Sequence, residues 1–94
     1  MVKSFKDKET QRLFMGRKSK AVSQQVSRKA LRLLTQLDRV GSVEEMATPP
    51  GNRPHKLGGD REDEWAVWID KQYRITFRFK DGDAHDVEAT DYHP

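Results

Sequence analysis

Apolar side chains recur every three or four residues through the middle of the first half of the chain. The positions are Val22, Val26, Ala30, Leu33, Leu34 and Leu37. The basic residues of this segment lie off that stripe, and Gly41 follows as a helix stop. The spacing predicts an amphipathic helix whose apolar stripe packs on a sheet.

The segment before this helix predicts a short strand and a shorter helix. Residues 2–5 have strand character, and Asp7 is placed to cap a helix that runs to about Met15. Gly16 ends this helix, and residues 17–20 form a basic connector.

After position 65 the apolar period changes from helical to two. Residues 44–46 add a helical turn, and residues 48–52 have turn composition. Two half-buried strands then follow, and a third begins after a turn at 81–83. The inward positions of the first two strands are Trp65, Val67, Ile69, Tyr73, Ile75, Phe77 and Phe79.

One strand register makes the apolar faces agree. A three-residue hairpin loop at 81–83 sets Lys80 against Ala84. The same register pairs Phe77 with Val87, Ile75 with Ala89, Arg78 with Asp86, Thr76 with Glu88 and Arg74 with Thr90. A similar loop at 70–72 pairs Val67 with Ile75 and Trp68 with Arg74. The second face of the sheet is therefore predicted to gather Trp68, Arg74 and Tyr92.

This order of elements predicts an α+β fold with two helices covering one face of an antiparallel sheet. The 94 residues are expected to form one domain, 1–94, because two halves would each be too small to bury a core. The chain has no cysteine, no apolar run that could cross a bilayer, and no signal-peptide core at its start. We expect a cytoplasmic protein without disulfides.

Charge is distributed unevenly along the chain. Residues 1–40 hold eleven Lys or Arg and three Asp or Glu, whereas residues 41–94 hold seven and twelve. A basic lobe of this kind is typical of proteins that bind a polyanion. The solvated faces of basic helices produce the same pattern, so charge alone leaves both interpretations open.

Three residues could carry the proton transfers of RNA cleavage. Without a metal, this reaction needs a base for the ribose 2′-hydroxyl and an acid for the leaving 5′-oxygen. His55 and His93 suit either role, and Asp91 could act as a base or orient His93. The sequence does not assign acid and base between them.

Fixed positive charge and aromatic rings complete the candidate set. Arg74 could clamp a phosphate with its planar guanidinium, and Lys56 could add a point charge. Tyr92 or Trp68 could stack on an unpaired base.

Each of these choices has a structural alternative. His55 could be an exposed loop residue, and the Asp-Tyr-His ending could be a frayed terminus. Alternation puts His55 on the same face as Leu57, so it needs a strand edge or a bulge to reach the second face. Arg78 facing Asp86 is interpreted as a cross-strand ion pair. The acidic residues at 81–86 and His85 lack the spacing of a metal site, so we expect neither a metal nor a cofactor.

Several segments, taken in order, resemble one toxin family. They are residues 2–5, the run from His55 to Arg61, the strand with Trp65, the Arg-Ile-Thr-Phe strand at 74–77 and the Asp-Tyr-His ending at 91–93. Together they resemble the HigB branch of the RelE/ParE toxin superfamily. The resemblance implies a RelE-like fold, with two N-terminal helices packed on a twisted antiparallel β-sheet and an active site on the concave face. It also implies that His55, Arg74, Asp91, Tyr92 and His93 belong to that active site.

The same resemblance implies a function and partners. It implies the toxin of a type II toxin–antitoxin pair, a ribosome-dependent endoribonuclease that cleaves mRNA on the 70S ribosome. The partner would be a helix-turn-helix HigA-type antitoxin, through which alone the toxin would meet operator DNA. We expect no membrane partner. The basic residues expected to contact the ribosome are Lys18, Lys20, Arg28, Lys29 and Arg32.

Two departures from the family pattern keep other functions open. Family members commonly carry Lys where this chain has Gly58, and many carry a basic or polar side chain at the position of Trp68. The alternatives are a ParE-like toxin that binds gyrase and has no nuclease activity, and a relative that binds its antitoxin with weakened cleavage. The Asp-Tyr-His ending and His55 argue against the gyrase binder, because binding alone does not need an acid–base set.

Overall fold

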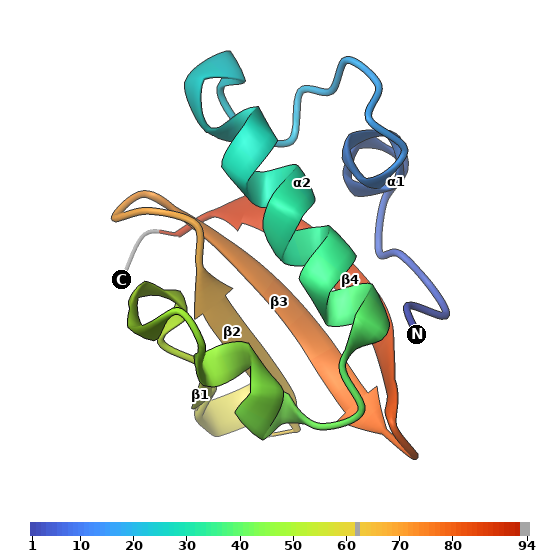
Figure 1. Cartoon of the computed structure of the whole chain (residues 1–94), viewed down its shortest axis with the longest axis vertical. Coiled ribbons are helices and arrows are strands. Elements are labelled where there is room, and N and C mark those ends of the chain that lie inside the picture. Colours follow the sequence, from blue (N-terminus) through green and yellow to red (C-terminus); the bar gives the residue numbers. More distant parts are fainter. Residues whose placement is uncertain (62, 93–94) are drawn as a thin grey trace.

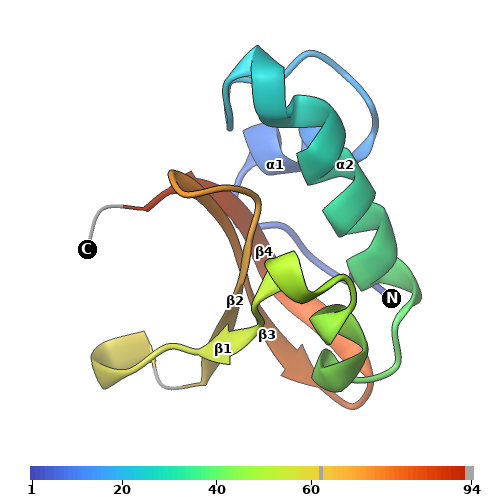
Figure 2. The same ribbon diagram turned by 60° about the vertical axis from the view of Figure 1, so that its left-hand side comes forward.

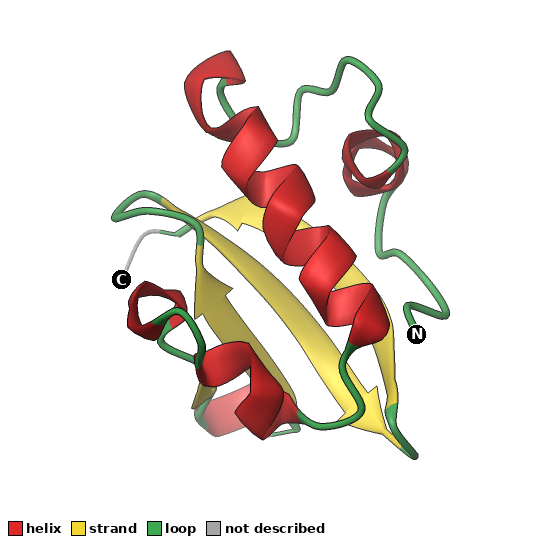
Figure 3. Cartoon of the chain, in the orientation of Figure 1, coloured by secondary structure: helices red, strands yellow, loops and turns green. Residues whose placement is uncertain are grey.

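A computed structural model describes residues 1–61 and 63–92 of the chain. The fold is α+β, with two α-helices and one four-stranded antiparallel sheet of order β1-β2-β3-β4 (Figure 1; Figure 3). The helices are α1 (Lys8–Phe14) and α2 (Gln24–Arg39). The strands are β1 (His55–Lys56), β2 (Glu64–Trp68), β3 (Tyr73–Lys80) and β4 (Asp83–Asp91). Between α2 and β2 lie three 3₁₀ turns, Val43–Ala47, Pro50–Asn52 and Gly59–Arg61.

The predicted first helix is confirmed, including both of its ends. The Thr10 backbone N–H donates to the Asp7 carboxylate at 2.7 Å, which satisfies one of the free amides of the first turn. After Phe14 the chain turns through Gly16, whose φ of +74° lies in the left-handed region. The 17–20 connector follows without regular structure.

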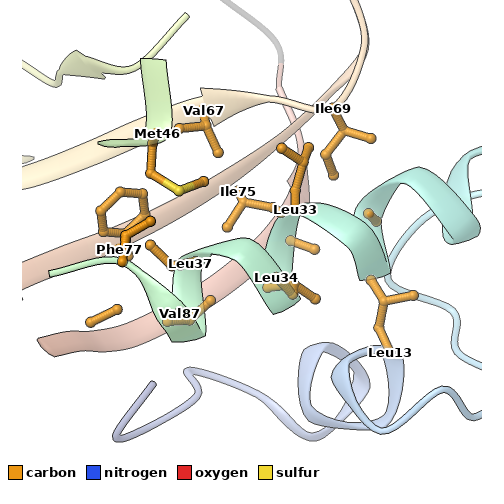
Figure 4. Packing of buried hydrophobic residues seen from close by; sticks show 14 of the residues in the cluster. Leu13, Leu33, Leu34, Leu37, Met46, Val67, Ile69, Ile75, Phe77 and Val87 are labelled. Atoms are coloured by element: carbon orange, nitrogen blue, oxygen red, sulfur yellow. The ribbon is translucent and has the colours of Figure 1, made fainter. Parts of the chain in front are cut away.

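The predicted amphipathic helix is confirmed as α2, and its stripe forms the centre of the core. Ala30, Leu33, Leu34 and Leu37 are buried and pack over the sheet against Ile75, Phe77 and Val87 (Figure 4). Val22 is also buried, but it precedes the helix, which has Ser23 at its N-cap. The helical turn expected at 44–46 is the 3₁₀ turn Val43–Ala47, whose Met46 packs into the same core.

The strand expected at residues 2–5 is only partly formed. Val2 and Phe5 make isolated parallel bridges to Ala84 and Val87 of β4, without a continuous ladder. The Lys3 N–H donates to the Ala84 carbonyl at 2.8 Å, and the Val2 N–H donates to the Asp38 carboxylate at 2.8 Å. The segment therefore covers the outer edge of β4 and ties it to α2.

The predicted strand register is confirmed near the site and wrong near the hairpin tip. Val67 pairs with Ile75, Trp68 with Arg74, Arg74 with Thr90, Ile75 with Ala89 and Thr76 with Glu88. At the tip, however, Lys80 pairs with Asp83 and Arg78 with His85.

The reason for this difference is a tighter turn followed by a bulge. Asp81 and Gly82 both have positive φ, 53° and 81°, so they form the two-residue type I′ turn that an Asp-Gly pair favours. The extra residue is taken up between Thr76 and Arg78 by a bulge opposite, where Asp86 has φ of 52°. Asp86 still meets Arg78, at 3.3 Å between Nε and a carboxylate oxygen, so the expected ion pair is present.

The sheet has two different faces. The helix face carries Val67, Ile75, Phe77 and Val87 under α1 and α2, which both lie on one side of the sheet (Figure 2). The second face carries the alternate residues of the strands, among them Ala66, Trp68, Arg74, Thr76 and Thr90. Within the described part of the chain, neither helix has the length and apolar composition needed to span a membrane.

Candidate functional site

The second face carries a row of side chains that crosses three strands. Trp68 of β2, Arg74 of β3 and Thr90 of β4 are cross-strand partners in this row. The Arg74 guanidinium carbon lies 3.8 Å from the centroid of the Trp68 ring and 5.1 Å from that of Tyr92. The prediction that Trp68, Arg74 and Tyr92 gather on this face is confirmed.

Arg74 is a buried cation held by backbone oxygens. Only 6% of its surface is exposed, and Nη1 donates to the carbonyls of Asp70 and, at 3.1 Å, Tyr73. Burial lowers the pKa of the Arg74 guanidinium, electrostatic interactions with Tyr92 and Asp70 raise it, and the nearby Arg53 lowers it. It remains protonated at neutral pH because the starting pKa of a guanidinium is so high. Within residues 1–61 and 63–92 no carboxylate forms a salt bridge with it, so no ion pair in these ranges neutralises its charge.

His55 reaches the second face from the edge of the sheet. Strand β1 has two residues, and His55 pairs with Ala66, which shares a face with Trp68 and Thr76. The edge position that the sequence required is therefore confirmed. One strand, β2, lies between His55 on β1 and Arg74 on β3. The two inter-strand spacings correspond to on the order of 10 Å between their backbones.

The imidazole of His55 has a defined tautomer when it is neutral. Its Nδ1 lies 2.9 Å from the Arg53 carbonyl oxygen. A carbonyl oxygen only accepts, so Nδ1 carries the proton and Nε2 has the free lone pair. Nε2 is thus the atom that could take or return a proton at this face.

Arg53 is a residue of this face that the sequence analysis missed. Its guanidinium carbon lies 4.3 Å from the centroid of the Trp68 ring. Arg53 precedes β1 and has a φ of 45°, so it lies outside the β1–β2 ladder, which begins at His55. Strand alternation therefore does not assign its side chain to a face.

The end of β4 is tied to the β2–β3 hairpin. The Tyr92 N–H donates to the Gln72 carbonyl at 2.7 Å, and the Gln72 side-chain amide donates to the Asp91 carboxylate at 3.0 Å. Strand alternation directs Asp91 to the opposite side from Tyr92, so these two predicted residues do not share a face. His93 lies outside the described residues.

Lys56 and the predicted basic residues lie away from this row. Lys56 pairs with Trp65, so it lies on the other side of the sheet from His55, and its Nζ is 5.7 Å from the Trp65 ring centroid. The basic residues of the connector and α2 are all exposed, and α2 covers the helix face (Figure 2). They are Lys18, Lys20, Arg28, Lys29 and Arg32.

A second missed feature is an ion pair at the start of β2. Arg61 donates to both oxygens of Glu64, at 2.8 and 3.2 Å, and Glu64 is only 3% exposed. The hydrogen-bonded Arg61 lowers the pKa of Glu64, and Glu64 raises the pKa of Arg61 in return. This bidentate pair fixes the turn that connects β1 with β2.

Two further observations concern polar groups. Across the described ranges, no three His, Asp or Glu side chains gather closely enough to hold a metal ion. The Thr76 hydroxyl, in the row between Ala66 and Glu88, is buried and has no hydrogen-bond partner among the described residues.

The fold and this face are those of a small α+β protein with a cationic, aromatic-lined site on one side of a sheet. Residues 3–93 match the family model described as the RelE-like toxin of type II toxin–antitoxin system HigB, and the chain belongs to this family. It is 38% identical to "Endoribonuclease HigB" of Proteus vulgaris, over 99% of this chain and 100% of that protein. It is also 28% identical to "Toxin HigB-1" of Vibrio cholerae serotype O1, over 87% of each.

Proposed function

We propose that this chain is the toxin of a type II toxin–antitoxin pair and that it cleaves mRNA on the translating ribosome. The observation that carries the proposal is Arg74, a buried guanidinium without a carboxylate partner in the described ranges, set between two aromatic rings on the face that His55 reaches. The printed name of the Proteus vulgaris relative, an endoribonuclease, supports the same activity.

The proposed chemistry is attack of the ribose 2′-hydroxyl on the adjacent phosphorus. The oxygen–phosphorus bond to the 2′-oxygen forms, the bond to the 5′-oxygen of the next nucleotide breaks, and the products carry a 2′,3′-cyclic phosphate and a 5′-hydroxyl. His55, through Nε2, and His93 share the two proton transfers, and Asp91 supports His93. Arg74 stabilises the crowded phosphate, and Tyr92 holds the adjacent base. This route uses no metal and no cofactor.

The proposed setting follows the distribution of charge. The basic residues of the connector and α2 are exposed on the side of the sheet away from Arg74, so they are free to contact ribosomal RNA while the second face meets the message. The proposal also includes a RelE-like twisted sheet, a cytoplasmic location and a helix-turn-helix HigA-type antitoxin. That antitoxin would be the link to operator DNA.

The test is cleavage of a defined message on programmed ribosomes, mapped by primer extension. Wild-type protein should cut within codons only when ribosomes are present, because the ribosome orders the message for in-line attack. His55→Ala and His93→Ala should each lower the rate by about 100-fold, the usual contribution of general acid–base groups.

The result that would contradict the proposal is an absence of cuts in the message with wild-type protein and ribosomes. Growth arrest that persists in cells expressing His55→Ala or His93→Ala would then support the gyrase-binding alternative. Loss of arrest, with antitoxin binding retained, would support a toxin relative with lapsed cleavage.

A further inference from the structure

We propose that Arg53 is a substrate-binding residue of this site. Its guanidinium, supported by the Trp68 ring beside Arg74, would bind a second backbone phosphate of the single-stranded message, next to the one that is cut. This inference rests on the ribonuclease function proposed above.

The geometry places two cations on one aromatic ring. The guanidinium carbons of Arg53 and Arg74 lie 4.3 and 3.8 Å from the centroid of Trp68. Trp68 and Arg74 are cross-strand partners, and Arg53 reaches the same ring from the segment directly before β1. Trp68 therefore serves as a support that orients two planar donors, since guanidinium groups favour the faces of aromatic rings.

The acidic side chains near this row are engaged elsewhere. Asp70 accepts from the backbone N–H groups of Gln72 and Tyr73, at 2.9 and 2.7 Å. Glu64 is paired with Arg61, and Asp63 with Arg78. Among the described residues, neither Arg53 nor Arg74 has a salt-bridge partner. Two adjacent cations without a salt-bridge partner repel each other, and a chain of phosphates removes that repulsion.

The backbone that carries Arg53 is held in place. Its φ of 45° lies in the left-handed region, its N–H donates to the Pro50 carbonyl at 3.3 Å, and its own carbonyl accepts from His55. The preceding Asn52 is 1% exposed, and its amide donates to the Met46 and Thr48 carbonyls at 3.0 and 3.2 Å. Such a support reduces the entropy lost when the exposed side chain binds a phosphate.

The test is single-turnover cleavage on programmed ribosomes at increasing protein concentration, with three variants. Arg53→Gly removes the guanidinium and leaves a residue that accepts a positive φ, so the support of His55 is kept. Arg53→Lys keeps the charge without the planar group. Lys80→Ala, at the far end of β3, removes one exposed charge elsewhere and is the matched control.

The expected result is a change in binding and not in the chemical step. Arg53→Gly should raise the half-saturating concentration about tenfold and leave the maximal rate within about twofold, because a contact away from the reacting phosphate stabilises substrate and transition state equally. The half-saturating concentration of Arg53→Lys should lie between those of wild type and Arg53→Gly, and that of Lys80→Ala should equal the wild-type value. A plot of the logarithm of the half-saturating concentration against the logarithm of the salt concentration should have a slope about 0.7 shallower for Arg53→Gly than for wild type. This difference is the value for one phosphate contact on a single strand.

A second readout is coupling with Trp68. Arg53→Gly should have little further effect in a Trp68→Leu background, because the guanidinium has lost its support there. If Arg53→Gly does not fold, as judged by thermal melting, Arg53→Lys is measured in its place, alone and in the Trp68→Leu background.

Two results would overturn the assignment while leaving the ribonuclease function intact. One is a half-saturating concentration for Arg53→Gly equal to that of Lys80→Ala. The other is a lower maximal rate with unchanged half-saturation, which would mean that Arg53 only supports His55. If the wild type itself does not cut, the proposed function fails and this inference fails with it.

Discussion

Arg74 keeps a positive charge that a substrate could bind, and burying this charge lowers the stability of the fold. Burying a guanidinium is unfavourable unless its donors are satisfied, and here backbone carbonyls of Asp70 and Tyr73 accept part of them. Carbonyl oxygens satisfy hydrogen bonds without cancelling the net charge. The remaining charge lies between the rings of Trp68 and Tyr92, where a phosphate is the natural partner.

At the same scale, the sequence predicted some site residues and missed others for physical reasons. Trp68, Arg74 and Tyr92 follow from strand alternation, which assigns side chains to faces. Arg53 does not, because it belongs to a turn where alternation has no meaning. The tautomer of His55 is fixed by the backbone carbonyl of residue 53. Every residue type has such a carbonyl, so the sequence does not indicate this contact.

Thr76→Val is expected to stabilise the protein. The Thr76 hydroxyl is buried without a partner in the described part of the chain, so a methyl group of similar shape removes a desolvation cost of about 1 kcal/mol. The matched control is Thr10→Val, since the equally buried Thr10 hydroxyl accepts from the Ala89 N–H at 3.0 Å. In urea unfolding, the free energy of unfolding should rise for Thr76→Val and fall by about 1–3 kcal/mol for Thr10→Val. Equal losses for both would contradict this account of Thr76.

The β3–β4 hairpin shows what patterns predict about an element and what they do not. Apolar alternation specified the pairing of Ile75 with Ala89 and of Arg74 with Thr90. It could not distinguish a three-residue loop from a two-residue loop followed by a bulge, because both leave the apolar residues inward. The left-handed φ values of Asp81, Gly82 and Asp86 determine which of the two loops forms. These backbone angles are not visible in the pattern of apolar and polar residues.

Gly82→Ala should therefore lower the free energy of unfolding. The φ of +81° at Gly82 is strained for an alanine by about 1–2 kcal/mol, whereas an added Cβ would meet only the Gly41 carbonyl oxygen at an ordinary 3.8 Å. The control is Gly51→Ala, which has a Cβ site with no atom within 4 Å and an unstrained backbone. Urea unfolding should leave Gly51→Ala within about 0.5 kcal/mol of wild type. A Gly82→Ala variant as stable as wild type would refute the turn assignment.

At the scale of the whole molecule, the two sides of the sheet carry two separate groups of cations. Both α1 and α2 lie on one side of the sheet (Figure 2), and the exposed cations belong to the connector and α2. The cation–aromatic row lies on the second face. The uneven charge was visible in the sequence. The separation of basic surface and site was not, because it depends on which sheet face the helices cover. We propose that one side binds the ribosome and the other cleaves the message.

The central claim is that the second face cleaves RNA by attack of the 2′-hydroxyl, with Arg74 stabilising the phosphate. The most direct measurement is the chemistry of the ends that wild-type protein and Arg74→Lys leave on a message in programmed ribosomes. The claim predicts 5′-hydroxyl and 2′,3′-cyclic phosphate ends. The same ends should form about 100-fold more slowly in Arg74→Lys, because an ammonium cannot reproduce the planar donors. Products with 5′-phosphate ends, or Arg74→Lys cutting at the wild-type rate, would contradict it.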